Sequence, residues 1–138
     1  MKLTSDLIRD VLICIEKNLS IESDLMSLRI SSMHWSKIFK DEHLCQRYDI
    51  DNIKYCIYKL KEEGLIKGIV VNGGGRIISI DIDDITWNGY ELLNNIKDDN
   101  LWDVIKTKLG GVTKFSISVL SAIAKETLTN WGLQQLSV

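Results

Sequence analysis

Apolar side chains recur at helical spacing near the start of the chain. The stripe consists of Leu7, Ile8, Val11, Leu12 and Ile15. It predicts a helix from about Ser5 to Asn18, which Thr4 or Ser5 can cap. The following stretch, 19–35, has a weaker pattern. Apolar and polar residues alternate there only in one place, which indicates one short strand: Leu28, Ile30 and, at its start, Met26 alternate with Ser27, Arg29 and Ser31.

Two further helices are predicted before the first glycine. Ser36 can cap one that runs from Lys37 to Gln46 and buries apolar side chains such as Ile38, Phe39 or Leu44. The next begins at Asp49 or Asp51 and ends near Glu63. Its apolar seam consists of Ile50, Ile53, Ile57 and Leu60. Gly64 suits the left-handed conformation that often follows a helix.

A β-hairpin is predicted in the middle of the chain. Leu65–Val71 is rich in Ile and Val, and Arg76–Ile82 alternates between apolar and polar residues. The intervening Asn72–Gly75 run is a strong turn signal. Acidic residues close the second strand, so 83–86 is the expected linker to the C-terminal part.

Three helices are predicted after this linker. Thr86 can cap one that ends near Lys97, and Asp98 and Asp99 can cap another from Asn100 to Leu109. Gly110 and Gly111 interrupt the pattern. The last helix, about 116–131, would bury Leu120, Ile123, Ala124, Leu128 and Trp131.

The order of these elements defines the expected fold class. Helix, short strand, helix, turn, helix and hairpin is the order of a winged helix-turn-helix. We therefore expect a mainly helical α+β protein. Residues 1–83 would form the winged helix-turn-helix domain, and residues 84–138 a C-terminal helical extension.

Two stretches resemble a known family. Residues 53–68, IKYCIYKLKEEGLIKG, follow a winged-helix pattern in which the recognition helix turns into the wing. In 85–109, a Thr-Trp-x-Gly run and an Asp-Asp-x-x-Trp run resemble an uncharacterised bacterial and phage family of winged-helix proteins. The matching residues are Thr86, Trp87, Gly89, Leu93, Asp98, Asp99 and Trp102. The resemblance implies a winged-helix fold and frequent carriage on prophages, but no activity and no functional residues.

Several of the matching residues have structural interpretations. Trp87 and Trp102 are large enough to be apolar anchors. Asp98 and Asp99 can accept hydrogen bonds from free amides at a helix start. Gly89 would permit close packing against a neighbour, for example a tryptophan ring.

Composition narrows the class of protein. The chain has 138 residues, 17 lysines and arginines, 19 acidic residues and a formal net charge of -2, which excludes a polybasic nucleic-acid binder. Hydrophobic residues make up 45%, enough for an ordinary core. Three cysteines without a C-x-x-C pair fit a reducing cytoplasm. No apolar run approaches the ~20 residues of a membrane span.

DNA binding is the first functional hypothesis. With the apolar seam of the third helix inward, its other faces carry Lys54, Tyr55, Tyr58 and Lys59, and Arg76 lies at the hairpin tip. These five residues are the expected contacts to double-stranded DNA. Asp51 and Glu62 share the outward face, so the surface is not strongly cationic.

The sequence contains no pattern typical of a catalytic site or a metal site. His34, His43, Cys45 and Cys56 have a spacing that matches no zinc-site pattern. The chain has no G-x-S-x-G and no recognisable Cys–His pairing. We therefore expect no enzyme, no metal and no cofactor.

Two functions remain open. The first is a small prophage or mobile-element regulator that binds DNA. The alternative is a winged-helix protein-interaction module, an adaptor or inhibitor that acts on a host or phage protein without binding DNA. Both would be cytoplasmic, without a membrane partner. An apolar tail of Leu128, Trp131, Leu133, Leu136 and Val138 further predicts a homodimer.

Overall fold

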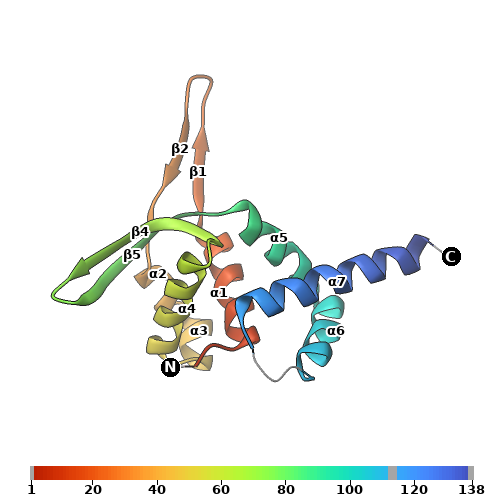
Figure 1. The fold of residues 1–138 in the computed structure, drawn as a ribbon. Helices are drawn as coiled ribbons and strands as arrows, with labels where there is room; N and C mark the ends of the chain where they lie inside the picture. Colours follow the sequence, from red (N-terminus) through yellow and green to blue (C-terminus); the bar gives the residue numbers. More distant parts are fainter. Residues whose placement is uncertain (1, 112–114, 137–138) are drawn as a thin grey trace. The chain divides into compact units, whose positions relative to one another are not determined.

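The computed structural model describes residues 2–111 and 115–136, with side chains described as far as Trp131. This part of the chain is a mainly helical α+β structure with seven helices and two small antiparallel sheets (Figure 1). The chain divides into two compact units, Met1–Gly89 and Tyr90–Val138. The prediction of a mainly helical α+β class is therefore confirmed.

Helix α1 spans Ser5–Asn18, as predicted. The Thr4 hydroxyl accepts a hydrogen bond from the Leu7 backbone amide at 3.2 Å, which caps the helix. The predicted apolar stripe is buried, and each such side chain contributes roughly 1.5–3 kcal/mol of transfer free energy. Helix α1 is therefore a central core element of the first unit.

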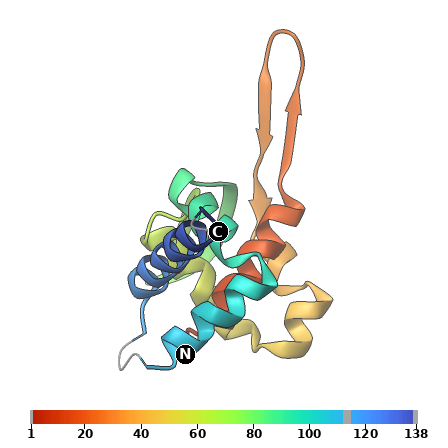
Figure 2. The ribbon, with the colours of Figure 1, turned by 90° about the vertical axis from the view of Figure 1, so that its right-hand side faces the viewer.

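An antiparallel β-arm follows α1. Its strands are β1 (Ser20–Ser23) and β2 (Leu28–Ser31), which pair with each other and project from the helices of the first unit in both views (Figures 1 and 2). The short strand predicted around Leu28 and Ile30 is confirmed as β2, although Met26 and Ser27 belong to the turn before it, and β1 was missed. A third strand, β3 (Met33–His34), was also missed and belongs to the second sheet.

The single helix predicted from Lys37 to Gln46 is wrong. The structure has two short helices, α2 (Ser36–Phe39) and α3 (Glu42–Arg47). Asp41 causes the break, because its carboxylate accepts a hydrogen bond from the Leu44 amide at 3.1 Å and starts a new helix.

Helix α4 spans Ile50–Glu62 and begins after Asp49. Ile53, Ile57 and Leu60 are fully buried, which confirms the seam at these positions. The prediction that Ile50 belongs to the seam is wrong, since this side chain is 47% exposed. It lies in the first turn of α4 and lines an open hollow instead of facing the core. Gly64 ends this segment with a φ of 74°.

The β4–β5 hairpin consists of β4 (Ile66–Gly73) and β5 (Arg76–Ile85). The three-stranded sheet has the order β3-β5-β4. The predicted turn is confirmed, with positive φ angles at Gly74 and Gly75. Strand β5 extends three residues beyond the expected end, so residues 83–85, expected in a linker, are strand.

The start of α5 (Trp87–Ile96) is anchored to the α4–β4 turn. The Thr86 hydroxyl donates to the Gly64 carbonyl at 2.6 Å and accepts from the Gly89 amide at 3.1 Å. A Cβ at Gly89 would lie 2.0 Å from the Leu65 carbonyl oxygen. The prediction of close packing at Gly89 is confirmed, with a backbone carbonyl as the neighbour in place of an indole ring.

Trp87 is 85% exposed, so its prediction as a buried anchor is wrong. At 100° per residue, the buried side chains of α5 lie about half a turn from Trp87. These are Leu92, Leu93 and Ile96. Trp102 is buried, as predicted.

The second unit contains α6 (Asp99–Leu109) and α7 (Ile117–Leu136). Asp98 caps α6 by accepting from the Leu101 amide at 2.9 Å, as predicted. Leu120 and Ala124 of α7 are buried, but Leu128 and Trp131 are exposed, so their prediction as core residues is wrong. The side chains of Leu133, Leu136 and Val138 lie outside the described residues.

Candidate interaction site at α4 and the β4–β5 hairpin

The five predicted DNA contacts all lie in the first unit. Lys54, Tyr55, Tyr58 and Lys59 lie on α4 and are half-buried, whereas Arg76 is exposed at the start of β5. Helix α4 therefore places four of the five residues on neighbouring turns, within residues 54–59. Arg76 is carried separately, at the tip of the hairpin.

Lys54 is engaged by aromatic rings of its own chain. Its Nζ lies 5.6 Å from the centroid of the Trp35 ring and 5.0 Å from that of Phe39. The two rings pack edge to face, 5.8 Å apart. Such cation–π contacts stabilise the ammonium group where it is. Moving Lys54 to a phosphate would break them.

Lys59 is neutralised by Glu62. Its Nζ lies 2.9 Å from Glu62 Oε1 and also approaches the rings of Tyr55 and Tyr58. The hydrogen bond raises the pKa of Lys59 and lowers that of Glu62. A hydrogen bond to Glu62 also raises the pKa of Tyr58. This group of side chains is partly exposed to solvent and carries no net charge.

Arg76 is the most available cation of the predicted set. It follows the Gly74–Gly75 turn, and in the described part of the chain its guanidinium has no carboxylate partner. The surrounding segment is nevertheless not cationic. Residues 50–85 contain five lysines and arginines against six acidic residues. Its field would not concentrate a polyanion.

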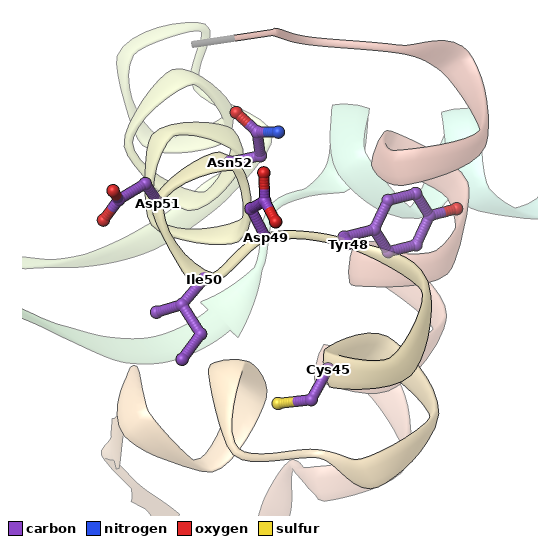
Figure 3. A pocket seen from close by; sticks show the side chains of 6 residues that line it. All are labelled: Cys45, Tyr48, Asp49, Ile50, Asp51 and Asn52. Carbon is purple, nitrogen blue, oxygen red and sulfur yellow. The ribbon is translucent and has the colours of Figure 1, made fainter.

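A shallow hollow lies where α3 meets α4. It has a volume of about 580 Å³, and Figure 3 shows the side chains that line it. Its lining consists of Cys45, Tyr48, Asp49, Ile50, Asp51 and Asn52. A second hollow of about 300 Å³ shares Cys45, Tyr48, Asp49 and Asn52 with the first. The two therefore adjoin and form one depression along this turn.

Contacts to α1 hold the turn between α3 and α4 in place. The Tyr48 hydroxyl donates to Asp10 Oδ2 at 2.6 Å, and Arg47 Nη1 donates to the same oxygen at 2.8 Å. Burial and the hydrogen bond to Asp10 raise the pKa of Tyr48. Because Tyr48 lines the hollow, these bonds fix one of its walls.

The chemistry of the hollow is acidic and apolar. Asp49 and Asp51 are exposed, and within the described residues neither carboxylate has a cationic partner. Between them Ile50 presents an exposed apolar side chain. Sequence reasoning placed Asp51 on an outward face of this helix but did not predict the hollow, although the run Tyr48-Asp49-Ile50-Asp51 contained its signal, an apolar residue between two acids.

The four residues considered for zinc do not come together. His34 Nδ1 interacts with the Ser36 hydroxyl, His43 with Arg47, and the Cys45 thiol donates to the Phe39 carbonyl. Cys56 is fully buried, and burial raises the pKa of its thiol. Among residues 2–111 and 115–136, no group of three or more His, Cys, Asp or Glu is arranged to hold a metal ion.

Comparisons with known proteins gave one result. A family model described as "Hypothetical protein (DUF2513)" matches residues 2–113. No curated protein and no solved structure matches the chain. The described helices also include none whose length and apolarity would allow it to span a bilayer.

Proposed function

Since the chain belongs to the DUF2513 family, whose description assigns no activity, we propose its function from the site: a winged-helix module that binds a protein. Membership supports the resemblance to an uncharacterised family. The bound segment would enter the hollow between α3 and α4. Encoded on a prophage, such a module would act as an adaptor or inhibitor of a host or phage protein.

The order of elements supports the winged-helix part of this proposal. Helices α3 and α4 are joined by a two-residue turn and followed by the β4–β5 hairpin. The short strand β3, which precedes α2, pairs with the second strand of that hairpin. In a winged helix-turn-helix, α4 would be the recognition helix and the β4–β5 hairpin the wing.

The observation that carries the protein-binding part is the charge at the start of α4. In a helix-turn-helix the N-terminal residues of the recognition helix face the DNA bases. Here that position carries the unpaired carboxylates of Asp49 and Asp51 beside the exposed Ile50. Phosphates on both sides of a groove would repel them. A protein segment with an apolar residue flanked by lysine or arginine complements this surface.

DNA binding is the second candidate. The exposed Arg76 at the glycine tip supports it, because a wing arginine can contact phosphate or enter a minor groove. Lys61 and Lys67 add charge nearby. Lys54 and Lys59, however, would first have to leave their own partners.

Site-specific photocrosslinking in the native host tests the first candidate. A photoreactive amino acid replaces Ile50, and Val104 of α6 serves as the matched control, since both residues are 47% exposed. We expect a crosslinked protein at position 50 and none at position 104. The crosslink should be lost on Asp51→Lys and kept on Asp103→Lys. Equal crosslinking at both positions would contradict the proposal.

A gel shift with random duplex DNA tests the second candidate. At ~50 mM salt, a DNA-binding winged helix should show salt-sensitive, sequence-independent affinity. Arg76→Ala would then weaken binding to all sequences alike. We expect little binding by the native protein and an increase with Asp51→Lys. Tight native binding that Arg76→Ala abolishes would favour the regulator over the adaptor.

A further inference from the structure

The β-arm, residues 20–31, is the most exposed apolar feature among the described residues of the first unit. All the large apolar side chains of the arm are exposed. They are Ile21, Leu25, Met26, Leu28 and Ile30. An isolated two-stranded hairpin is marginally stable in water. An arm of this kind therefore gains from a surface that covers it.

The register of the arm separates an apolar face from a polar face. Ile21 lies opposite Ile30, and Ser23 lies opposite Leu28. Because side chains alternate along a strand, these residues share one face. The other face carries Ser20, Glu22, Arg29 and Ser31, with Glu22 opposite Arg29. The arm is thus an amphipathic ribbon whose apolar face is left uncovered by the described residues of the first unit.

The tip of the arm is held by its own turn. Asp24 Oδ1 accepts hydrogen bonds from the Met26 and Ser27 amides, both at 2.8 Å, and from the Ser27 hydroxyl at 3.1 Å. These bonds lower the pKa of Asp24. Leu25 and Met26 remain 102% and 92% exposed. The turn therefore fixes an apolar tip in solvent.

The base of the arm is attached to the second sheet. The Ser32 hydroxyl donates to Asp83 Oδ1 on β5. Strand β5 has a register shift at this point, opposite Lys67 and Gly68. This hydrogen bond limits how far the base of the ribbon can move from β5.

We propose that the apolar face of the arm binds the same face of a second copy of this chain. Two copies of Ile21, Leu28 and Ile30 would stack across a two-fold axis, as in a small β-sandwich. The polar faces would stay in water, so Glu22 and Arg29 would not be buried. This inference is independent of the proposed function, because it uses neither α4 nor the hollow.

The area and the charge of the arm favour a second copy. At roughly 200 Å² for a fully exposed large residue, Ile21, Leu28 and Ile30 offer on the order of 300 Å² per chain, and the tip residues Leu25 and Met26, which must join the contact, raise this to about 700 Å². A standard interface buries ~800 Å² on each partner. The only charges in the arm are Glu22, Asp24 and Arg29, two of them opposite each other and one bound in its own turn. This leaves little charge with which to select a basic or acidic partner, whereas an identical apolar face is complementary.

Sedimentation velocity over ~1–300 µM tests the proposal, using the full chain with Cys45→Ser to prevent oxidation. We expect a concentration-dependent dimer. The double variant Leu28→Glu/Ile30→Glu should raise the dimer Kd at least tenfold. The matched control Glu22→Gln/Arg29→Gln changes the opposite face and should leave the Kd within threefold. At a protein concentration below the native dimer Kd, where association adds no stability, circular dichroism should show the same unfolding midpoint for all three proteins.

A second variant guards against an arm that misfolds. Replacing residues 21–30 with an Asn-Gly turn removes the apolar face entirely and should give a monomer. A native protein that stays monomeric at 300 µM overturns the proposal. A dimer that survives both arm variants also overturns it and would assign the contact to the tail of α7. If the arm binds neutral phospholipid vesicles and the protein does not dimerise, the proposal is overturned and the apolar face is a lipid-binding surface.

Discussion

Replacing Gly89 with alanine should destabilise the first unit, although the residue lies in a helix. Helix propensity alone favours alanine by about 1 kcal/mol. The new Cβ, however, would lie 2.0 Å from the Leu65 carbonyl oxygen and 2.6 Å from Ile85 Cγ2. A backbone carbonyl cannot rotate away, so α5 must shift, and overpacking of this kind costs ~3 kcal/mol. Weakening the hydrogen bonds of Thr86 adds about 1 kcal/mol.

The expected net effect is a loss of about 3 kcal/mol in the free energy of unfolding. Urea denaturation followed by far-UV circular dichroism and tryptophan fluorescence measures it. Asn88→Ala is the matched control, because Asn88 is exposed in the same turn of α5 and should change stability by no more than ~0.5 kcal/mol. If Gly89→Ala is as stable as the native protein, the close approach to Leu65 is wrong.

Three further predictions concern hydrogen bonds, thiols and pH. Thr86→Val should cost about 1–2 kcal/mol of stability in urea, whereas Thr86→Ser should retain most of it, since the hydroxyl bonds to Gly64 and Gly89 are then kept. With iodoacetamide at pH 7.5, mass spectrometry should find Cys45 alkylated first, because Cys56 is buried and burial raises the pKa of Cys14 to about 11. Labelling of all three at equal rates would contradict this. Folding raises the pKa of both Cys14 and Tyr48, so their protonated forms favour the folded state. The stability that they contribute should be complete below about pH 8.5, the ordinary pKa of a cysteine, and should be lost as the pH rises through the pKa values of the two groups in the folded protein. Tyr48→Phe should flatten the decline above about pH 10, and an unchanged decline would refute that assignment.

Capping, turn and periodicity patterns predicted the elements whose bounds depend on residues close together in the sequence. Thr4 caps α1, Asp98 caps α6, and Gly74 and Gly75 form the turn of the β4–β5 hairpin, all at the expected positions. In each case the decisive interaction joins residues at most four apart. The seam of α4 was also predictable, because a repeat of apolar side chains at helical spacing requires a core beside it.

The features that were missed depend on contacts between distant residues or on the absence of such contacts. Strand β1 has one apolar residue, and its partner follows a turn held by Asp24, so no alternation reveals it. The break at Asp41 leaves the helical periodicity intact and comes from a single cap. Trp87 is exposed because the rest of α5 buries the opposite face, which its size alone does not indicate.

The candidate site was predicted only in part, because some of its contacts lie within α4 and others join α4 to residues far away in the sequence. Sequence placed Lys54 and Lys59 on accessible faces of α4, and their location on α4 is correct. The rings that hold Lys54 come from residues 35 and 39, before the helix, and only the folded chain brings them near. The pair of Lys59 with Glu62 lies within one turn of α4 and was accessible to sequence reasoning.

Ser20 and Ser31 lie opposite each other at the foot of the β-arm, so the chain leaves the domain and returns at neighbouring points. Such an excursion can lengthen, shorten or change its composition while α1 and β3 keep their places. Insertions and deletions there are tolerated more readily than in the core, and they alter how far the arm extends. Mutation can therefore tune this projecting surface separately from the hollow beside α4, and the two can follow independent evolutionary histories.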